Sequence, residues 1–359
     1  MQGSIPYWGA NSIQDYVNRA KVNRPTVLLG EDGAPFYDRG KSVAFYVNEP
    51  IWPNNHIHVL FPNANVDGRW LAYALNAVDY SVVITGSTRD KLTQKAMMSI
   101  ELLTPGFRGQ RAIADYLDQE TAQIDALVAK QEELIELLRE RRRAEIVSTI
   151  DGMDTNRASL RHFTRVVSGS GFPVEVQGQV GLEFPFFKVK DLRSSDGSGL
   201  LSPPGDSISR ETARDLRAAI IPRGSLVFAK VGAALLLGRV GALPMDACID
   251  NNMSALIFDS SFDPAFARYL MLTFDFRQFV QPGPVPSLNM DGLREFHVPV
   301  PEMRLQVEVA ARLDEQISRI DTLIAKAEEH IALAKERRSA LITAAVTGQI
   351  DVRTARKAG

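Results

Sequence analysis

Two stretches of the chain alternate hydrophobic and polar residues with the spacing of a long amphipathic helix. Over residues 111–146 the apolar positions recur in steps of three and four, which is typical of a helix that lays one narrow seam against a single partner. About 36 residues at 1.5 Å each predict a rod of roughly 55 Å. The seam positions are Leu117, Ile124, Leu127 or Val128, Leu134 or Ile135, and Leu138.

The second stretch repeats the first. The segment QRAIADYLDQETAQIDALVAKQ, which begins at Gln110, returns without a gap as QVEVAARLDEQISRIDTLIAKA at Gln306, a shift of 306 − 110 = 196 residues. Gly152 and Gly348 stand where each helix should end. We therefore expect a duplicated chain of pseudo-two-fold symmetry whose long helices pair antiparallel, or exchange partners between two chains. The seam of the second copy consists of Leu313, Ile317, Ile320, Ile324, Ile331 and Leu341.

A globular segment precedes each helix. Short apolar runs bounded by Gly, Pro and Asn predict strands at 27–29, 43–47 and 57–61, and again at 226–229 and 254–258. Helical patterns follow at 69–77 and 264–274. Because strands and helices do not alternate regularly, the predicted fold class is α+β, with two globular domains and two helical spacers. The predicted boundaries are 1–104 for the first domain, 105–152 for its spacer, 153–300 for the second domain, 301–350 for its spacer and 351–359 for a tail.

The duplication extends into the globular segments. The stretch 155–182 has no counterpart in the first copy, so the first domain is N-terminally truncated relative to the second or does without this piece. The correspondences are 30–34 with 229–233, Asn54-Asn55 with Asn251-Asn252, Trp70-Leu71 with Tyr269-Leu270, Leu92 with Leu288, Pro105 with Pro301, and Ile5-Pro6 with Phe184-Pro185.

Composition places few limits on the protein. With 359 residues, 45% of them hydrophobic and 23% charged, the chain has the make-up of a water-soluble protein of two domains. It has neither a signal-peptide pattern nor an apolar run long enough to span a membrane. The single cysteine, Cys248, is expected to be buried and agrees with a reducing, cytoplasmic location. A net charge of −2 means that any DNA contact must be local.

Catalytic motifs are scarce. Gly40-Lys41-Ser42 resembles the end of a phosphate-binding loop, but Pro35 stands where that loop needs its first glycine. His56 and His58 could begin a metal site, yet no third ligand follows at a suitable spacing. The run 168–171, Ser-Gly-Ser-Gly, is interpreted as a flexible turn. We predict no catalytic residue, metal ligand or cofactor of the chain's own.

Basic residues cluster in predicted loops of both domains. Beside Asn, Ser and aromatic neighbours they can neutralise phosphates and reach base edges, although solvated surface charge is the alternative for each one. The candidate DNA-contact residues are Lys21, Arg39 and Lys41 in the first domain and Lys188, Lys190, Arg193, Arg210 and Lys230 in the second.

Three features resemble the specificity (S) subunits of Type I restriction-modification systems. Each globular segment ends in a proline-containing edge and a glutamine-led helix with the core Ile-Asp-x-Leu-x-x-Lys at 124–130 and 320–326. The segments VLLGEDGAPFYDRGKSVAFYVNEPIWPNNHIHVLF and GSLVFAKVGAALLLGRVGALPMDACIDNNMSALIF resemble target recognition domains. The order of domain, helix, domain, helix is also that of the family.

The resemblance implies a non-catalytic subunit that reads a bipartite site in double-stranded DNA, one half for each domain. The helices would set the spacing and dock methyltransferase (modification) subunits, for which Arg141, Arg142, Arg337 and Arg338 are candidates. These partners would supply S-adenosylmethionine and adenine methylation, and a restriction (translocase and nuclease) subunit would supply ATP-driven cleavage. Two alternatives remain: the recognition subunit of a single-complex restriction endonuclease, or a coiled-coil scaffold from a degenerate specificity gene.

Overall fold

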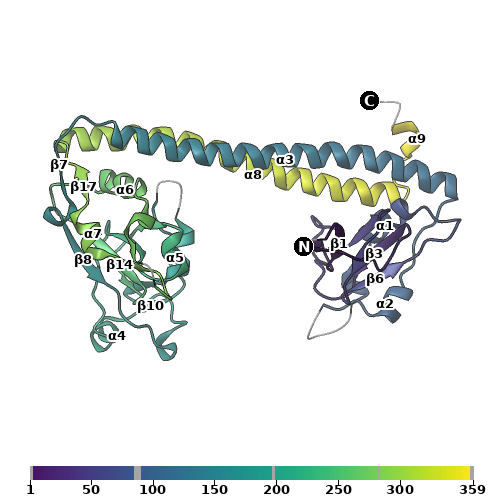
Figure 1. Ribbon diagram of the computed structural model, residues 1–359, viewed down its shortest axis with the longest axis horizontal. Coiled ribbons are helices and arrows are strands. Elements are labelled where there is room, and N and C mark those ends of the chain that lie inside the picture. Colours follow the sequence, from purple (N-terminus) through teal and green to yellow (C-terminus); the bar gives the residue numbers. More distant parts are fainter. Residues whose placement is uncertain (1–2, 85–89, 196–198, 282, 356–359) are drawn as a thin grey trace. The chain divides into compact units, whose positions relative to one another are not determined.

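The computed structural model describes residues 3–84, 90–195, 199–281 and 283–355. The chain divides into two compact units. Unit 1 comprises Met1–Leu134 and Ala327–Gly359, and unit 2 comprises Ile135–Lys326. Two long helices, α3 (Phe107–Asp151) and α8 (Met303–Val346), each contribute a part to both units (Figure 1). Within the described residues no helix combines the length and the hydrophobicity needed to cross a membrane.

Among its described residues, the globular part of unit 1 contains two three-stranded sheets and three short helices. In the first sheet β3 lies antiparallel between β4 and β6; in the second, β1 is antiparallel to β2 and parallel to β5. The elements are β1 (Ile5–Trp8), β2 (Ile13–Val17), β3 (Thr26–Gly30), β4 (Ala44–Val47), β5 (Trp52–Pro53), β6 (Ile57–Leu60), α1 (Gly68–Asn76), η1 (Tyr80–Val82) and α2 (Gln94–Met98).

Strand β3 is the centre of the unit 1 core because both of its faces are buried. Val27 and Leu29 join a hydrophobic cluster that includes Leu75 of α1, whereas Leu28 joins a second cluster with Ile51. A strand covered on both faces appears in the sequence as a continuous apolar run, which is why 27–29 predicts β3.

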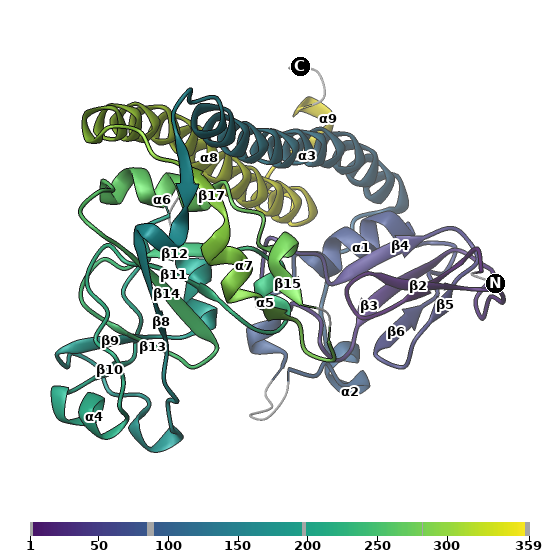
Figure 2. The same cartoon turned by 60° about the vertical axis from the view of Figure 1, so that its left-hand side comes forward.

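Unit 2 contains the same two sheets with additions. The sheet order is β12-β11-β14-β8, and β9 lies between β10 and β13. In Figure 2 helix α6 lies between the long helices and this four-stranded sheet. The elements are β7 (Arg157–Ser159), η2 (Leu160–His162), β8 (Thr164–Ser168), η3 (Val174–Val176), β9 (Phe184–Phe187), η4 (Val189–Ser194), β10 (Ser207–Ile208), α4 (Arg210–Asp215), β11 (Leu226–Ala229), α5 (Ala233–Leu236), β12 (Val240–Ala242), β13 (Cys248–Ile249), β14 (Met253–Phe258), α6 (Pro264–Leu272), η5 (Phe276–Phe279), β15 (Val280–Gln281), β16 (Ser287–Leu288), α7 (Met290–Glu295) and β17 (His297–Pro299). A short helix in unit 1, α9 (Val352–Ala355), follows α8.

The predicted fold class and internal duplication are confirmed by this topology. Strands β1, β2 and β5 pair as β9, β10 and β13 do, and β3, β4 and β6 pair as β11, β12 and β14 do. Gly33 and Gly232, which the sequence aligns, both adopt φ 76°, a left-handed conformation that favours glycine. Strands β7 and β8 fall in the stretch 155–182 and have no counterpart among the described residues of unit 1.

The sequence alignment of the helices α1 and α6 was wrong by three residues. Asp67 caps α1 and Asp263 caps α6, and the hydroxyl groups of Tyr73 and Tyr269 donate to equivalent carboxylates of the long helices. These pairs are all 196 residues apart, so Tyr269 corresponds to Tyr73 and not to Trp70. The error arose because the aromatic residues at 70 and 73 both suit the buried face of a helix.

The aligned asparagine pairs were wrong by one residue. The Asn54 side chain accepts a hydrogen bond from the N–H of His56 at 2.9 Å, and the Asp250 side chain accepts one from the N–H of Asn252 at 2.6 Å. Asn54 therefore corresponds to Asp250, because either side chain can close the same turn.

The run 168–171, interpreted as a flexible turn, is held in place instead. The N–H of Gly169 donates to Met253 O at 3.1 Å and that of Ser170 to Ile249 O at 3.0 Å. A Cβ at Gly169 would lie 2.0 Å from Asp250 O. Glycine is needed at position 169 because two backbone segments approach each other closely there.

A buried glutamine ties each globular part to its long helix. Gln306 accepts a hydrogen bond from the N–H of Asp263 at 2.7 Å and donates to Ser261 O and Pro301 O, both at 2.9 Å. Its side chain is fully buried, at 0% exposure. Because Asp263 caps α6, one side chain fixes the start of α6 against the start of α8.

Unit 1 repeats this latch. Gln110 accepts from the N–H of Asp67 at 2.8 Å and donates to Asn65 O at 3.2 Å and to Pro105 O at 2.9 Å. The glutamine that leads each repeated helix is therefore a structural residue.

A carboxylate about two helical turns further along the long helix makes a second tie in each unit. In unit 1 Asp118 accepts from Arg69 at 2.7 Å and from the Tyr73 hydroxyl at 2.9 Å. In unit 2 Asp314 accepts from Arg268 at 3.0 Å and from the Tyr269 hydroxyl at 2.6 Å. Burial is the main cause that raises the pKa of Tyr73 to about 12, and its hydroxyl therefore stays protonated as a donor.

Within each unit the parts of α3 and α8 run antiparallel. In unit 1 Arg338 donates to Asp125 at 2.8 Å, and in unit 2 Arg142 donates to Asp321 at 2.9 Å. These are the same pair twice, 196 residues apart. Two of the four arginines considered for partner docking thus bind the neighbouring helix, whereas Arg141 and Arg337 are exposed.

The structure shows which residue of each adjacent pair, Leu127 or Val128 and Leu134 or Ile135, belongs to the seam of α3. Ile135 is buried and Val128 half-buried, whereas Leu127 and Leu134 are 48% and 42% exposed. Helix α3 is also longer than the predicted 111–146. It starts directly after Gly106, whose carbonyl accepts from Gly109 and Gln110, and it ends directly before Gly152.

Candidate nucleic-acid interface

Lys230 lies at the end of β11 on a loop that is fixed through its backbone. Its N–H donates to Asn252 O at 2.9 Å, and its carbonyl accepts from the N–H of Leu288 at 2.9 Å. The side chain is half-buried. Because these hydrogen bonds involve only the backbone of Lys230, they fix the loop without using its ammonium group.

Unit 1 uses the same backbone frame for an acid. The N–H of Glu31 donates to His56 O at 2.9 Å, and its carbonyl accepts from Leu92 at 2.8 Å. The Glu31 carboxylate pairs with Lys91 at 3.1 Å. Glu31 is therefore the counterpart of Lys230. The same position of the backbone carries a positive side chain in unit 2 and a negative one in unit 1.

Lys188 is the candidate most engaged within the fold. Its ammonium group lies 2.8 Å from the Asp206 carboxylate, donates to Gln177 at 2.9 Å and lies 4.8 Å from the ring centre of Phe172. That ring stacks on Phe186 at 3.8 Å. The hydrogen bond from Lys188 is the main cause that lowers the pKa of Asp206. The ammonium group of Lys188 is therefore engaged in contacts within the fold, and its role in DNA binding stays a prediction.

Three other candidates of unit 2 flank the same paired strands and are exposed. Lys190 and Arg193 lie on η4, which follows β9, and Arg210 is the first residue of α4, which follows β10. The guanidinium of Arg210 lies 4.9 Å over the Phe184 ring, which orients it while leaving its N–H donors available. These exposed cations suit a phosphate backbone.

The candidates of unit 1 lie on two loops. Lys21 follows β2, and its N–H donates to Ile51 O at 2.9 Å. Arg39 and Lys41 lie on the β3–β4 connection, where the Lys41 ammonium pairs with Asp38 at 3.0 Å. All three basic side chains are exposed. Lys41 sits in a turn closed by its own N–H on Asp38 O, not in a phosphate-binding loop.

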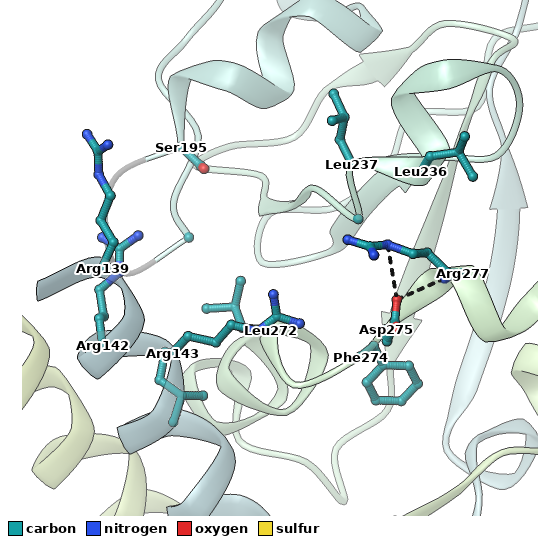
Figure 3. Close-up of a pocket in the computed structure, with 13 residues that line it drawn as sticks. Arg139, Arg142, Arg143, Ser195, Leu236, Leu237, Leu272, Phe274, Asp275 and Arg277 are labelled. Carbon is teal, nitrogen blue, oxygen red and sulfur yellow. Dashed lines mark hydrogen bonds and ion pairs between the residues drawn. The ribbon is translucent and has the colours of Figure 1, made fainter. Parts of the chain in front are cut away.

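The structure also gathers basic residues that the sequence interpretation did not single out. A pocket of about 270 Å³ in unit 2 is lined by Arg139, Arg142 and Arg143 of α3 and by Arg277 of η5. In Figure 3 the side chains of Arg143 and Arg277 point into the space between these elements. The run of arginines in α3 is visible in the sequence, but Arg277 lies far from it along the chain.

The histidines considered for a metal site have other contacts. His58 Nε2 lies 2.7 Å from Leu92 O, and His56 Nδ1 lies 3.7 Å from the Asp32 carboxylate. Across the residues that the structure describes, no three His, Cys, Asp or Glu side chains gather as metal ligands would.

The chain is thus an internally duplicated protein, in which two similar α+β domains are each attached to a pair of antiparallel long helices. Over residues 1–137 the sequence matches the family model of the Type I restriction modification DNA specificity domain. A putative type I restriction enzyme specificity subunit of Haemophilus influenzae is 34% identical over 122 residues, which are 34% of this chain and 31% of that protein. The match thus spans less than a third of the curated relative.

A solved structure extends the likeness in fold to nearly the whole chain. A chain from work on the complex assembly and conformational transition of a type I R-M system aligns with a TM-score of 0.70 at 14% identity, covering 93% of this chain and 86% of that one. The HsdS subunit of Thermoanaerobacter tengcongensis aligns with a TM-score of 0.48 at 15% identity, over 95% of this chain and 88% of that one. The resemblance inferred from the sequence is confirmed: residues 1–137 match the Type I restriction modification DNA specificity domain, and nearly the whole chain shares the fold of the chain from the type I R-M work.

Proposed function

We propose that the chain is the non-catalytic sequence-specificity subunit of a Type I restriction-modification complex. Unit 1 reads one half of a bipartite site in double-stranded DNA and unit 2 reads the other. Methyltransferase subunits, which dock on the long helices, methylate adenines, and a restriction subunit cleaves the DNA. The buried, single Cys248 fits the reducing cytoplasm in which such a complex works.

The observation that carries this proposal is one scaffold with two unlike surfaces. The latch glutamines, the capping aspartates and the backbone frame around residues 31 and 230 are alike in both units. The side chains on that scaffold differ in charge, as the half-buried Glu31 and Lys230 do. Two readers of different sequences need this combination, because phosphate contacts fix position while loop side chains select bases.

The ties between globular part and long helix support the role of the helices as a ruler. In each unit a buried glutamine and a carboxylate together fix the globular part on α3 and α8 through several hydrogen bonds. A reader held rigidly on a helix keeps its register on DNA, which is the condition for a fixed gap between half-sites.

Exposed leucines on the helix pair support docking of a partner. Leu127 and Leu333 in unit 1 are 48% and 55% exposed, and their counterparts Leu323 and Leu137 in unit 2 are 52% and 56% exposed. Four large apolar side chains at repeated positions exceed what a solvated helix needs. We assign these leucines, in each unit separately, to contacts with helices of the methyltransferase subunits.

The proposal is tested by co-expressing the chain with its methyltransferase and mapping methylated adenines in host DNA by single-molecule sequencing. We expect a bipartite motif with a fixed gap. Lys230→Glu should change or abolish one half-site and leave the other, because unit 1 carries Glu31 on the same backbone frame without loss of fold. Lys95→Glu on α2 of unit 1 makes the same change in charge and should leave the half-site of unit 2 unchanged.

The other outcomes are equally informative. A motif with a single half-site would show that only one unit reads sequence. A stable complex that methylates without any motif would overturn the proposal and favour the scaffold alternative.

A further inference from the structure

The arginine pocket of unit 2 is not part of any reader loop considered above. Its walls are α3 on one side and, on the other, the segment around η5 and the connection after α5. The buried side chains of Ile146 and Phe274 and the 58% exposed side chain of Leu237 also line it.

Two of the four lining arginines are neutralised by the long helices. Arg142 pairs with Asp321 at 2.9 Å and Arg139 with Glu136 at 2.6 Å. Arg143 and Arg277 are exposed and point into the pocket (Figure 3). The single acid among the described lining residues is Asp275, and its carboxylate lies 3.8 Å from Arg277 Nε.

Asp275 has a structural task that explains its presence. It caps η5 by accepting from the N–H of Arg277 at 3.1 Å. In unit 1 Asp79 makes the same cap for η1 by accepting from the N–H of Ser81 at 3.0 Å. The cap therefore needs the aspartate and works with serine at the position of Arg277.

The counterpart of Arg143 likewise shows that arginine is not required at this position of the fold. This counterpart, 196 residues later on α8, is Ser339, which lines a pocket at the corresponding place in unit 1. The helix pair of unit 1 forms with that serine in place. Neither arginine charge is required by the fold, since the duplicated copy folds with serine at both positions.

We propose that Arg143 and Arg277 bind a phosphate group of the DNA backbone in this pocket. The inference rests on the proposed function and adds a contact that is independent of base sequence. Two guanidinium groups offer several N–H donors for the oxygens of one phosphate. Unit 1 has serines at these two positions and so lacks this pair of guanidinium groups.

The test compares the methyltransferase complex of the wild-type chain with that of the double variant Arg143→Ala, Arg277→Ala. Binding to a duplex without the motif is measured as a function of salt, and methylation is mapped in parallel. We expect about tenfold weaker binding and a salt dependence reduced by about one phosphate contact, with the methylated motif unchanged. Arg304→Ala with Arg312→Ala is the control, because it removes two exposed arginines of α8 from the same unit.

Each result decides one question. If the double variant and the control have the same affinity and salt dependence, the pocket does not bind phosphate, whatever the methylation map shows. If the wild-type complex gives no motif, the proposed function fails, while binding to the motif-free duplex still tests the pocket.

Discussion

Replacement of Gln306 by leucine tests whether the latch holds unit 2 together. Leucine fills nearly the same volume but cannot form hydrogen bonds. The change therefore leaves three backbone groups without their partner: the N–H of Asp263 and the carbonyls of Ser261 and Pro301, now bonded at 2.7, 2.9 and 2.9 Å. The side chain is 0% exposed, so water does not reach these groups without opening the structure.

The magnitude follows from the number of groups left unsatisfied. A buried donor or acceptor that loses its partner costs about 1–3 kcal/mol, so the three together destabilise unit 2 by about 3 kcal/mol at the lower bound. For a unit of this size that corresponds to a fall in Tm of about 6–12 °C. Gln110→Leu should act in the same direction in unit 1 and somewhat less, because its bond to Asn65 O is longer, at 3.2 Å.

Differential scanning calorimetry of the full chain measures both effects. Gln119→Leu is the matched control, because Gln119 is an exposed glutamine on α3 and the substitution is identical. We expect its Tm to stay within about 2 °C of the wild type. A Gln306→Leu variant with the same Tm as the control would refute the reasoning. The three hydrogen bonds of Gln306 would then contribute nothing measurable to stability.

Two further predictions concern titratable groups of unit 2. The pKa of Asp206 is lowered mainly by its hydrogen bond from Lys188, so the pair stabilises the fold above the ordinary aspartate pKa and loses this contribution as pH falls through the lowered value. Thermal melts should show the gap between wild type and Asp206→Asn closing below about pH 4, and a gap that is independent of pH would contradict the assignment. Burial raises the pKa of Cys248 to about 11, so a thiol reagent at about pH 8 should label it only after unfolding; rapid labelling of the native chain would show that β13 opens.

The elements with strong local signals could be predicted from the sequence. Strands β3 and β11 are continuous apolar runs, and α3 and α8 repeat one pattern over more than thirty residues, so both elements and duplication were predicted correctly. The errors lie where two residues suit one local role. Trp70 and Tyr73 both fit the buried face of α1, and only the hydrogen bond from the Tyr73 hydroxyl to Asp118 shows which one Tyr269 repeats.

The candidate interface was less predictable, because exposure and pairing depend on tertiary contacts. Nothing near Lys188 in the sequence indicates that Asp206 will neutralise it. Arg143 and Arg277 lie 277 − 143 = 134 residues apart, and only the packing of η5 near α3 places them at one pocket. The aligned repeat did contain the signal that both positions are serine in the other copy.

A duplicated chain thus carries its own internal control for the role of a charge. Side chains that bond the backbone are retained at both copies, as Gln110 and Gln306 are, because each copy must fold. A charge present in one copy on an equivalent backbone, as at Lys230 against Glu31, is not required for folding. It is at such positions that the two units can differ in the DNA they bind, and substitutions there should alter recognition while leaving Tm within about 2 °C.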